Sequence, residues 1–416
     1  MQWTRLACYA VCFVICGCFQ EHGELQPLSS ARSQVAHDVA GAAARAGSRA
    51  PAPAERPRAH EAPTPPEVAV TPPNTPAAPE PPAQSEGADD AGIAEFGERV
   101  RSVSTFSYTT CALLENGTVR CWGENKWGQL GDGTFTNSSR PVQVRQLERV
   151  IQLDVGLKRA CAVGADGTLY CWGNNDAGML RNGQQGDQNL PVIAQGVEHV
   201  VEVSLGESQT CVRRTDFTLE CWLYNPNAPE LNVSNVTDVV GVEAGYFLTT
   251  ATLTDGSVQT WGENDLAGPM DVDSSRAVRS GYGFVCVLTD EATVRCKGVY
   301  SVHDFVERVD GLVPGLESVA NMSSGFEHTC AVVQQGKVYC WGRNNRGQLG
   351  DGSTEYTIEP REVVGLDQVI EVTCGREHSC AHKADGSVYC WGSNEQGELG
   401  DGTTTERHTP VRVIGL

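Results

Sequence analysis

Positive charge is scarce in this sequence. The 416 residues include 31 Lys and Arg against 52 Asp and Glu, a formal net charge of -21. Residues 98–416 hold 41 of these acids and 25 of these bases, so this part alone carries -16. A surface of this sign repels the phosphates of nucleic acids and of anionic lipids. We therefore expect no nucleic acid among the partners.

Local signatures of catalysis are also missing. The chain has no GxSxG elbow, no HExxH pair, no phosphate-binding loop and no dinucleotide fingerprint. We therefore expect a protein that is not an enzyme and that needs no cofactor. An active site assembled from distant segments would leave no local motif, so an enzyme remains an alternative.

Long apolar runs are absent from the N-terminal segment. The run from Leu6 to Cys16 follows Arg5 and is too short to span a bilayer, but it has the length of a signal-peptide core. The Gly17-Cys18 boundary after it resembles a bacterial lipoprotein cleavage box, which would make Cys18 the lipidated first residue. We expect residues 1–18 to be a signal peptide and the mature protein to be anchored by lipid at the cell envelope or surface. The alternative is an ordinary secretory signal and a secreted protein.

Residues 19–97 contain scarcely any large apolar side chains. Ala, Pro, Glu and Ser dominate, as in the stretch APTPPEVAVTPPNTPAAPEPPAQSEG. Such a segment cannot bury a core, and its polyproline stretches stay extended. We expect a disordered tether whose lipid anchor is its only contact with a membrane.

Cysteine, in contrast, is abundant and regularly spaced. In the stretch CALLENGTVRCWGENKWGQLGDG, from Cys111 to Gly133, two cysteines lie ten positions apart and a Trp-Gly pair follows the second. A further copy has Thr250 and Thr260 in the two cysteine places, which gives seven copies in all. The six cysteine pairs are Cys111 with Cys121, Cys161 with Cys171, Cys211 with Cys221, Cys286 with Cys296, Cys330 with Cys340 and Cys380 with Cys390.

The bracketed residues predict a β-hairpin. A three-residue loop ending in Gly117 places Leu114 opposite Thr118, so Cys111 faces Cys121 with Cα atoms about 4.5 Å apart. That separation suits a disulfide, and the joint loss of both cysteines in the fourth copy agrees with pairing. Paired cysteines at this density indicate an oxidising compartment, whereas zinc would need two more ligands at each site. We expect six disulfides and a free, buried Cys374.

Two copies depart from the turn pattern. Phe217 in the third copy and Ala292 in the fifth stand where the others have Gly. These two turns must therefore either differ in conformation or be strained.

The repeats predict an all-β fold. Seven copies in residues 98–416 leave about 46 residues each, with four short strands per copy and no sustained helical periodicity. Such units close into a seven-bladed β-propeller. Alternation places Cys111 and Leu113 on one face of a blade and Ala112 and Trp122 on the other, so both faces are apolar. We interpret the recurring Trp as a packing anchor.

The pattern CWGxNxxGQLGDG resembles the repeat of the regulator of chromosome condensation family. It is complete in 122–133 and 341–352, nearly complete in 391–402 and worn in 172–183. The preceding Gly325 and His328 find matches in Gly375 and His378. This resemblance covers residues 98–416 and implies a seven-bladed propeller. The founding member is an exchange factor for a nuclear GTPase, an activity that we do not transfer to an exported, acidic chain.

Two sets of residues are candidates for metal binding. His328 and His378 occupy equivalent places in neighbouring blades, but the other copies supply no third ligand there, so we expect hydrogen bonds within the blade. The acids Asp132, Asp351 and Asp401 lie between glycines without the spacing of a calcium loop, so we expect turn formers. Our prediction is that the protein holds no metal.

The third to fifth copies have lost the Gly-rich tail, and aromatic residues follow the Gly before each hairpin in the fourth to sixth. Equivalent loops of a propeller share one face, and we predict that this face binds a protein partner through the aromatic residues. We also predict that the protein is a monomeric, non-enzymatic, surface-tethered scaffold. Packing between blades is an equal alternative for the aromatics. Alternative functions are binding of carbohydrate or a cell-wall polymer, and an envelope hydrolase or lyase with a site across blades. The candidate partner-binding residues are Tyr246, Phe247, Tyr282, Phe284 and Phe326.

Overall fold

The computed structural model describes residues 99–224, 233, 236–262, 268–269, 274–302 and 305–416. The expected signal peptide with Cys18 and the expected tether lie outside the described residues. No helix in the described part of the chain is long and apolar enough to cross a bilayer.

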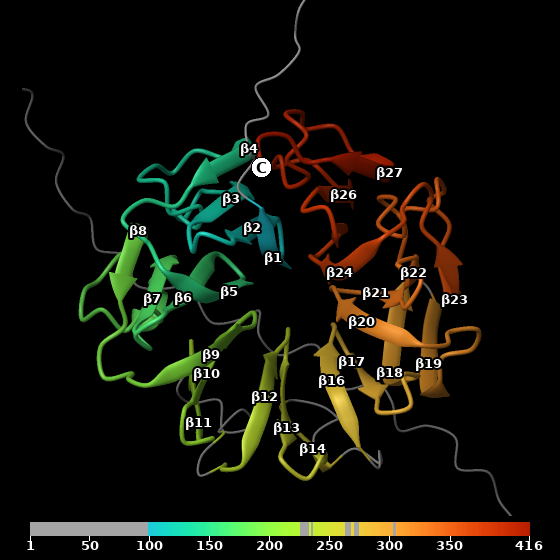
Figure 1. The fold of residues 1–416 in the computed structure, drawn as a ribbon, viewed down its shortest axis with the longest axis horizontal. Helices are drawn as coiled ribbons and strands as arrows, with labels where there is room; N and C mark the ends of the chain where they lie inside the picture. The colour runs from blue at the N-terminus through green and yellow to red at the C-terminus, as the bar shows by residue number, and fades with distance from the viewer. Residues whose placement is uncertain (1–98, 225–232, 234–235, 263–267, 270–273, 303–304) are drawn as a thin grey trace, which may run out of the picture. The chain divides into compact units, whose positions relative to one another are not determined.

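Seven antiparallel sheets are arranged around a common centre, as a seven-bladed β-propeller (Figure 1). Strand order within each sheet follows chain order, and the first strand of each blade is innermost. Blades one and two comprise β1 (Val100–Phe106), β2 (Thr109–Leu114), β3 (Val119–Gly123), β4 (Ser138–Gln143), then β5 (Val150–Gly156), β6 (Arg159–Gly164), β7 (Leu169–Gly173), β8 (Gln188–Ile193), with the short 3-10 helix η1 (Asp176–Gly178) after β7.

The middle blades follow in the same order. Blade three has three strands among its described residues. Blades three to five comprise β9 (Val200–Leu205), β10 (Gln209–Arg214), β11 (Leu219–Leu223), then β12 (Val239–Ala244), β13 (Leu248–Leu253), β14 (Val258–Gly262), β15 (Gly268–Pro269), then β16 (Ser275–Ser280), β17 (Phe284–Thr289), β18 (Val294–Val302), β19 (Phe305–Leu312). Blades six and seven comprise β20 (Val319–Ser324), β21 (His328–Val333), β22 (Val338–Gly342), β23 (Thr357–Glu362), then β24 (Val369–Cys374), β25 (His378–Lys383), β26 (Val388–Gly392), β27 (Arg407–Arg412).

The hairpin between the second and third strands has the register expected from the sequence. The amide of Leu114 donates to the carbonyl of Thr118 (2.9 Å), and Cys111 pairs directly with Cys121. Thr250 and Thr260 face each other in the same way in blade four.

The structure joins all six cysteine pairs as disulfides, with Cα–Cα distances of 4.0 to 4.1 Å. Each disulfide links the second strand of a blade to the third. The bonded pairs are Cys111 with Cys121, Cys161 with Cys171, Cys211 with Cys221, Cys286 with Cys296, Cys330 with Cys340 and Cys380 with Cys390. Six disulfides of this kind indicate a protein of an extracytoplasmic, oxidising compartment.

The turns at Phe217 and Ala292 keep the conformation of the other copies. Their φ angles are 63° and 60°, in the left-handed region where Gly117 has 81°. The backbone is therefore strained at these two residues, since a Cβ atom disfavours left-handed φ angles.

The hydrophobic cores lie between blades, so each blade has two apolar faces. Cys111, Leu113, Val119 and Cys121 pack against blade two, whereas Ala112, Leu114 and Trp122 pack against blade seven. This division confirms the alternation expected from the sequence. Four of the recurring tryptophans are fully buried: Trp122, Trp172, Trp341 and Trp391.

Each of these tryptophans also donates a hydrogen bond to the preceding blade. Trp172 Nε1 donates to the carbonyl of Gln129 (2.8 Å), which belongs to the Gly-rich tail of blade one. Trp122 Nε1 donates in the same way to Glu398 of blade seven (2.9 Å), and this bond helps to close the ring. The tail of one blade and the Trp of the next therefore form one structural unit, which confirms the role of the Trp as a packing anchor.

Inside the tail, a buried Asn organises the backbone. Asn125 Oδ1 accepts the amide of Leu130 (2.8 Å), and its Nδ2 donates to Asp132 Oδ1 (3.2 Å). Asp132 also accepts the amide of Thr134, two residues on (2.9 Å). The same arrangement recurs at Asp351 and Asp401, so these acids are turn formers as expected.

Candidate functional site

The innermost strands of all seven blades line a central channel that encloses about 310 Å³. Its wall is polar and includes the acids Asp154, Glu202, Glu243 and Glu371. Burial raises the pKa of Asp154 to about 6, although hydrogen bonds from Ser104 and from backbone amides oppose this shift. Burial raises the pKa of Glu243 to about 7, although Arg279 opposes this shift. The channel therefore holds carboxyl groups that titrate near neutral pH.

Most of these acids have a structural role, because they satisfy backbone amides of the next blade. Asp154 Oδ2 accepts the amide of Leu205 (2.7 Å), and Glu371 Oε2 accepts that of Val103 (3.1 Å). Uncharged side chains do the same elsewhere, as when Asn321 Oδ1 accepts the amide of Val372 (3.0 Å). Innermost strands of adjacent blades do not form a common ladder, so their buried amides need side-chain acceptors. The polar channel wall follows from that need.

Aromatic residues cover one mouth of the channel. We call this group the aromatic cap and define it as Phe106, Tyr246, Phe247, Tyr282 and Phe326. Phe106 ends β1 and stacks on Tyr246 of the loop between β12 and β13, with ring centroids 4.7 Å apart. Blades one and four are not neighbours in the ring, so this contact crosses the channel (Figure 1).

The cap is continuous from ring to ring. Tyr246 contacts Phe326 edge-on at 4.8 Å, Phe326 contacts Tyr282 at 4.5 Å, and Tyr282 contacts Phe247 at 5.3 Å. These spacings are those of favourable aromatic pairs. The loops before the second strands of blades four, five and six therefore meet, as equivalent loops on one face should.

The members of the cap differ in exposure. Tyr246 is only 3% exposed, whereas Tyr282 is 38% exposed, and Phe247 and Phe326 are partly buried. Burial raises the pKa of the Tyr246 hydroxyl far above its ordinary value. Tyr246 is thus the packed centre of the cap, and Tyr282 is its accessible edge.

Phe284 does not belong to this cap, so its inclusion among the candidate binding residues is wrong. It is fully buried and stacks on Tyr300 of β18, with centroids 4.2 Å apart. Phe284 is the first residue of β17, two positions after the loop residue Tyr282, and it points into the interface between blades five and six.

Charged side chains surround the aromatic cap. The Arg376 guanidinium lies 4.5 Å from the centre of the Phe326 ring, a cation–π contact. Burial raises the pKa of Glu207 above its ordinary value, while Arg376 and Lys158 oppose that shift. Aromatic rings with a charged rim are typical of protein interfaces.

His328 and His378 are inter-blade links, not within-blade hydrogen bonds as expected. Both are fully buried. His328 Nε2 bonds to Ser379 Oγ of blade seven (2.9 Å), and His378 Nε2 bonds to Thr110 Oγ1 of blade one (3.0 Å). Burial lowers the pKa of each to about 3, so both imidazoles are neutral. Each histidine begins the second strand of its blade, and its side chain points to the next blade.

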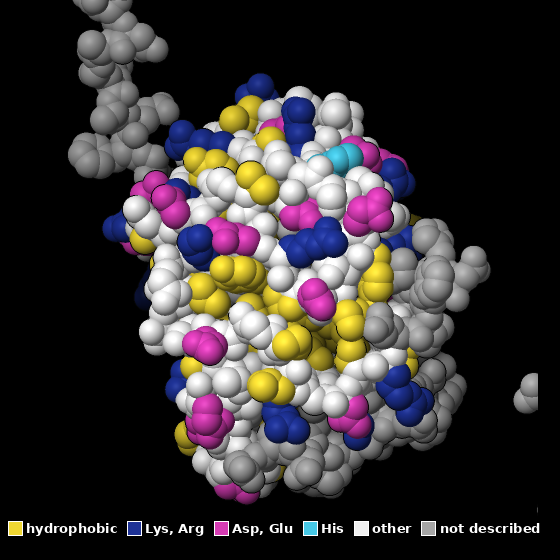
Figure 2. All heavy atoms as spheres, turned by 90° about the vertical axis from the view of Figure 1, so that its right-hand side faces the viewer, with side chains coloured by type: hydrophobic (Ala, Val, Ile, Leu, Met, Phe, Trp, Pro, Cys, Tyr) yellow, Lys and Arg dark blue, Asp and Glu magenta, His cyan; other side chains and the backbone are white. Residues whose placement is uncertain are grey.

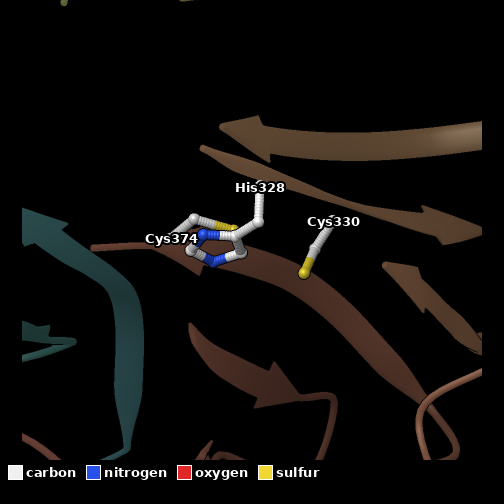
Figure 3. Close-up of side chains that lie close together, drawn as sticks. All are labelled: His328, Cys330 and Cys374. Carbon is white, nitrogen blue, oxygen red and sulfur yellow. The ribbon is translucent and has the colours of Figure 1, made fainter. Parts of the chain in front are cut away.

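The described residues include one group of three possible metal ligands, His328, Cys330 and Cys374 (Figure 3). Cys330 is bonded to Cys340, and Cys374 is free and buried, as expected. Burial raises the pKa of the Cys374 thiol to about 12. In the oxidised protein this group therefore offers neither thiolate.

Outside the channel mouth, charges of both signs are mixed over the surface. Figure 2 shows one side of the molecule, on which acidic and basic side chains alternate around hydrophobic ones. Several of these charges pair, as do Arg361 with Asp351 (3.0 Å) and Arg407 with Asp401 (3.0 Å). In both pairs the arginine is exposed, whereas the acid is largely buried.

These features define a seven-bladed propeller with an aromatic cap over its channel. Residues 116–163, 166–213, 335–382 and 385–416 match the regulator of chromosome condensation (RCC1) repeat, and a second model of that repeat matches residues 100–129, 150–178, 319–348 and 369–398. The two together cover about half of the chain, which therefore belongs to the RCC1 repeat family. Both leave out residues 214–318, which hold the rest of blade three and all of blades four and five, where the Gly-rich tail is worn.

Known proteins agree on the fold. Prp20p from Saccharomyces cerevisiae, described with its binding to Gsp1p and histones, is 18% identical with a TM-score of 0.62 over 77% of this chain and 88% of its own. Human WBSCR16 gives a TM-score of 0.62 at 17% identity, over 72% of this chain and 94% of its own. At such identity the likeness concerns the fold alone.

Curated relatives match over short segments only. The human E3 ubiquitin-protein ligase HERC2 is 31% identical over 134 residues, which are 26% of this chain and 3% of that protein. The ultraviolet-B receptor UVR8 from Arabidopsis thaliana is 40% identical over 45 residues, 11% of this chain and 10% of that protein. The chain thus matches a small part of each.

Sequence reasoning missed two members of the site. Phe106 occupies the position at which the later blades have the Gly before the hairpin. This departure from the repeat is the feature of the sequence that distinguishes Phe106. Arg376 lies at the same loop position as Tyr282 and Phe326, but it is not aromatic, so the pattern of loop aromatics does not include it.

Proposed function

We propose that this protein is a non-enzymatic, exported propeller that binds a protein partner through its aromatic cap. The observation that carries the proposal is the exposure of Tyr282 at the edge of a continuous aromatic cluster. Aromatic side chains that are partly exposed and held rigidly by neighbours are typical anchors of interfaces, each contributing about 2 kcal/mol or more. Arg376, stacked on Phe326, adds a residue type that is also enriched at such anchors.

The setting of the site supports a protein ligand. The acids of the channel wall largely accept backbone amides, so they offer few free groups to a substrate. A partner at the cap instead meets aromatic rings and a rim of both charges. Prp20p shows that a propeller of this fold is found with protein partners. We do not infer Gsp1p or histones for this acidic, disulfide-containing chain.

The expected lipid anchor at Cys18 and the tether of residues 19–97 complete the proposal. They would hold the propeller as a monomer at the cell envelope and leave the cap free to meet its partner. Membrane-fraction protein whose mature N-terminus is a residue other than Cys18 would contradict the anchor without affecting the cap.

Affinity capture from an envelope fraction tests the proposed function. Immobilised propeller should retain a protein that the Tyr282→Ser variant does not retain. The matched control is Phe217→Ser, because Phe217 is 46% exposed and lies in a hairpin turn at the opposite end of a blade. Retention of glycans in place of proteins, unchanged by Tyr282→Ser, would favour the carbohydrate alternative and contradict the proposal.

A further inference from the structure

The joint between blades six and seven holds an unusual group of soft ligand atoms. His328 and Cys330 belong to β21, and Cys374 ends β24 of the next blade. The nitrogen or sulfur atoms that they offer all lie within 4.8 Å of one another (Figure 3). The sulfur of Cys340 is bonded to that of Cys330, so a fourth ligand is adjacent.

These atoms surround a single hydroxyl group. Ser379 Oγ lies 2.9 Å from His328 Nε2, 3.7 Å from Cys330 Sγ and 4.0 Å from Cys374 Sγ. Its own proton is donated to the carbonyl of Gln348 (2.9 Å). The three ligand side chains thus converge on one point and do not merely lie near one another.

The neighbouring joint, between blades seven and one, lacks the third sulfur. His378 and the disulfide of Cys380 with Cys390 repeat the arrangement of His328 and the disulfide of Cys330 with Cys340. Blade one, however, has Thr105 at the position of Cys374. In the strand register, Thr105 lies opposite Thr110 just as Cys374 lies opposite Ser379. Thr105 Oγ1 hydrogen-bonds to Thr373 instead (2.8 Å). This joint is therefore a natural control for the other.

We propose that reduction of the Cys330–Cys340 disulfide turns this joint into a binding site for Zn²⁺, with His328 Nε2 and the sulfurs of Cys330, Cys340 and Cys374 as ligands. Three thiolates and one imidazole in tetrahedral arrangement are a common structural zinc site. With zinc–sulfur bonds of about 2.3 Å, the sulfurs of Cys330 and Cys340 must move apart once their bond is reduced, whereas the ligand atoms of His328 and Cys374 must move slightly closer to the metal. The Ser379 hydroxyl turns aside and keeps its bond to Gln348.

The chemistry balances with a dithiol as reductant. The dithiol gives two electrons and two protons to the Cys330–Cys340 bond and becomes a disulfide itself. Zn²⁺ then replaces the protons of three thiols, which pass to the solvent. His328 stays neutral, and its ring proton moves from Nε2, which binds the metal, to Nδ1. Metal uptake is therefore coupled to reducing conditions, since the oxidised protein has no free sulfur at Cys330.

The Cys340→Ser variant tests the site without reducing the other disulfides. Purified without oxygen as the full chain, it has Cys330 and Cys374 free beside His328. It keeps three of the four ligands, with water in the fourth position, and should bind one equivalent of Zn²⁺ more than the wild type. The wild type carries the same N-terminal cysteines and sets the baseline. The double variant Cys340→Ser/Cys374→Ser should return to that baseline. With Co²⁺ in place of Zn²⁺, thiolate charge-transfer absorption should exceed the wild-type baseline in the first variant and not in the double variant.

The control joint makes the test independent of how well one variant folds. Cys390→Ser frees Cys380 beside His378 without a third sulfur, so it should bind no extra Zn²⁺. Adding Thr105→Cys to Cys390→Ser should create the site there. Folded Cys340→Ser protein that takes up no zinc above the wild type would overturn the proposal, as would zinc retained after Cys374→Ser or a Cys390→Ser/Thr105→Cys protein that binds none.

Discussion

Phe217 shows what one side chain costs when the backbone demands glycine. Its φ of 63° strains an L-residue by about 1–2 kcal/mol, whereas glycine would cost about 0.5–1 kcal/mol in chain entropy. Because Phe217 is 46% exposed, little burial is lost on its removal. We expect Phe217→Gly to raise the free energy of unfolding in urea by about 0.5–1 kcal/mol.

The control for this prediction is the reverse change in another blade. A Cβ at Gly336 would lie 2.7 Å from the Cα of Gln368, and its φ is 74°. Gly336→Ala should therefore lower the free energy of unfolding. A Phe217→Gly protein no more stable than the wild type would show that the turn is not strained.

The raised pKa of Glu243 should make the free energy of unfolding depend on pH. Its folded-state pKa of about 7 lies above its unfolded value of about 4.3. At a pH below the pKa of the unfolded chain, the carboxyl is protonated in both states and does not change the free energy of unfolding. As the pH rises toward 7 the unfolded chain ionises first, so this group progressively destabilises the folded protein.

Glu243→Gln should remove this penalty. The difference in unfolding free energy between variant and wild type should grow in favour of the variant from pH 4.5 to pH 7.5, as measured by urea unfolding at each pH. The neutral His328 and His378 act with the opposite sign in both proteins, so they cancel in the difference. A difference that is constant with pH would contradict the assigned shift.

At the scale of the element, the hairpin was predictable because its interactions are local. Gly117 fixes the turn, the turn fixes the register, and the register brings Cys111 to Cys121. The alternation of Leu113 and Leu114 likewise separated the residues of the two faces of the blade, and the structure shows which neighbouring blade each face contacts. Each inference needed only about a dozen consecutive residues.

The cap could not be predicted in full because its contacts cross the ring. Nothing within blade one indicates that Phe106 meets Tyr246 of blade four, and the distinction between the loop residue Tyr282 and the core residue Phe284 depends on where β17 begins. The inter-blade bonds of His328 and His378 were missed for the same reason. The sequence shows the repeat, but the contacts between copies require their positions in space.

The blade itself supports a prediction about the disulfides. Blade four folds with Thr250 and Thr260 at the paired positions, both nearly fully buried. The double change Cys111→Thr/Cys121→Thr should therefore leave the fold intact and lower the free energy of unfolding by at most about 3 kcal/mol, since the hairpin is already ordered without the bond.

Mass mapping of the alkylated protein provides the control. In the unreduced, denatured wild type, Cys111 and Cys121 should remain unmodified. The single variant Cys111→Thr should lose at least as much stability as the double variant, because it leaves an unpaired thiol in the core. Alkylated Cys121 in the wild type would contradict the pairing.

For the whole molecule, the joints of the ring differ in strength. The joint between blades four and five has Leu248 at the place of His328 and Lys297 at the place of the Trp. Among the described residues, its polar links are the ion pair of Glu243 with Arg279, at 3.6 Å, and a hydrogen bond from Ser275 Oγ to the carbonyl of Gly256, at 3.4 Å. A cavity of about 290 Å³ lies between the two blades. The joint between blades six and seven instead has the His328–Ser379 and Trp391–Gln348 bonds.

We therefore expect the ring to open first between blades four and five. In hydrogen exchange under native conditions, amides of β13 and β16 should exchange faster than those of β21 and β24, which occupy equivalent places at the stronger joint. Uniform protection of all seven blades would contradict this difference between joints.

The central claim is that the aromatic cap binds a partner through its exposed edge and packs through its buried centre. The most direct measurement is the melting temperature and the partner capture of Tyr282→Ser and Tyr246→Ser side by side, with Phe217→Ser as control. We predict that Tyr282→Ser loses capture with a nearly unchanged melting temperature, and that Tyr246→Ser melts several degrees lower. Capture retained by a folded Tyr282→Ser protein would contradict the account.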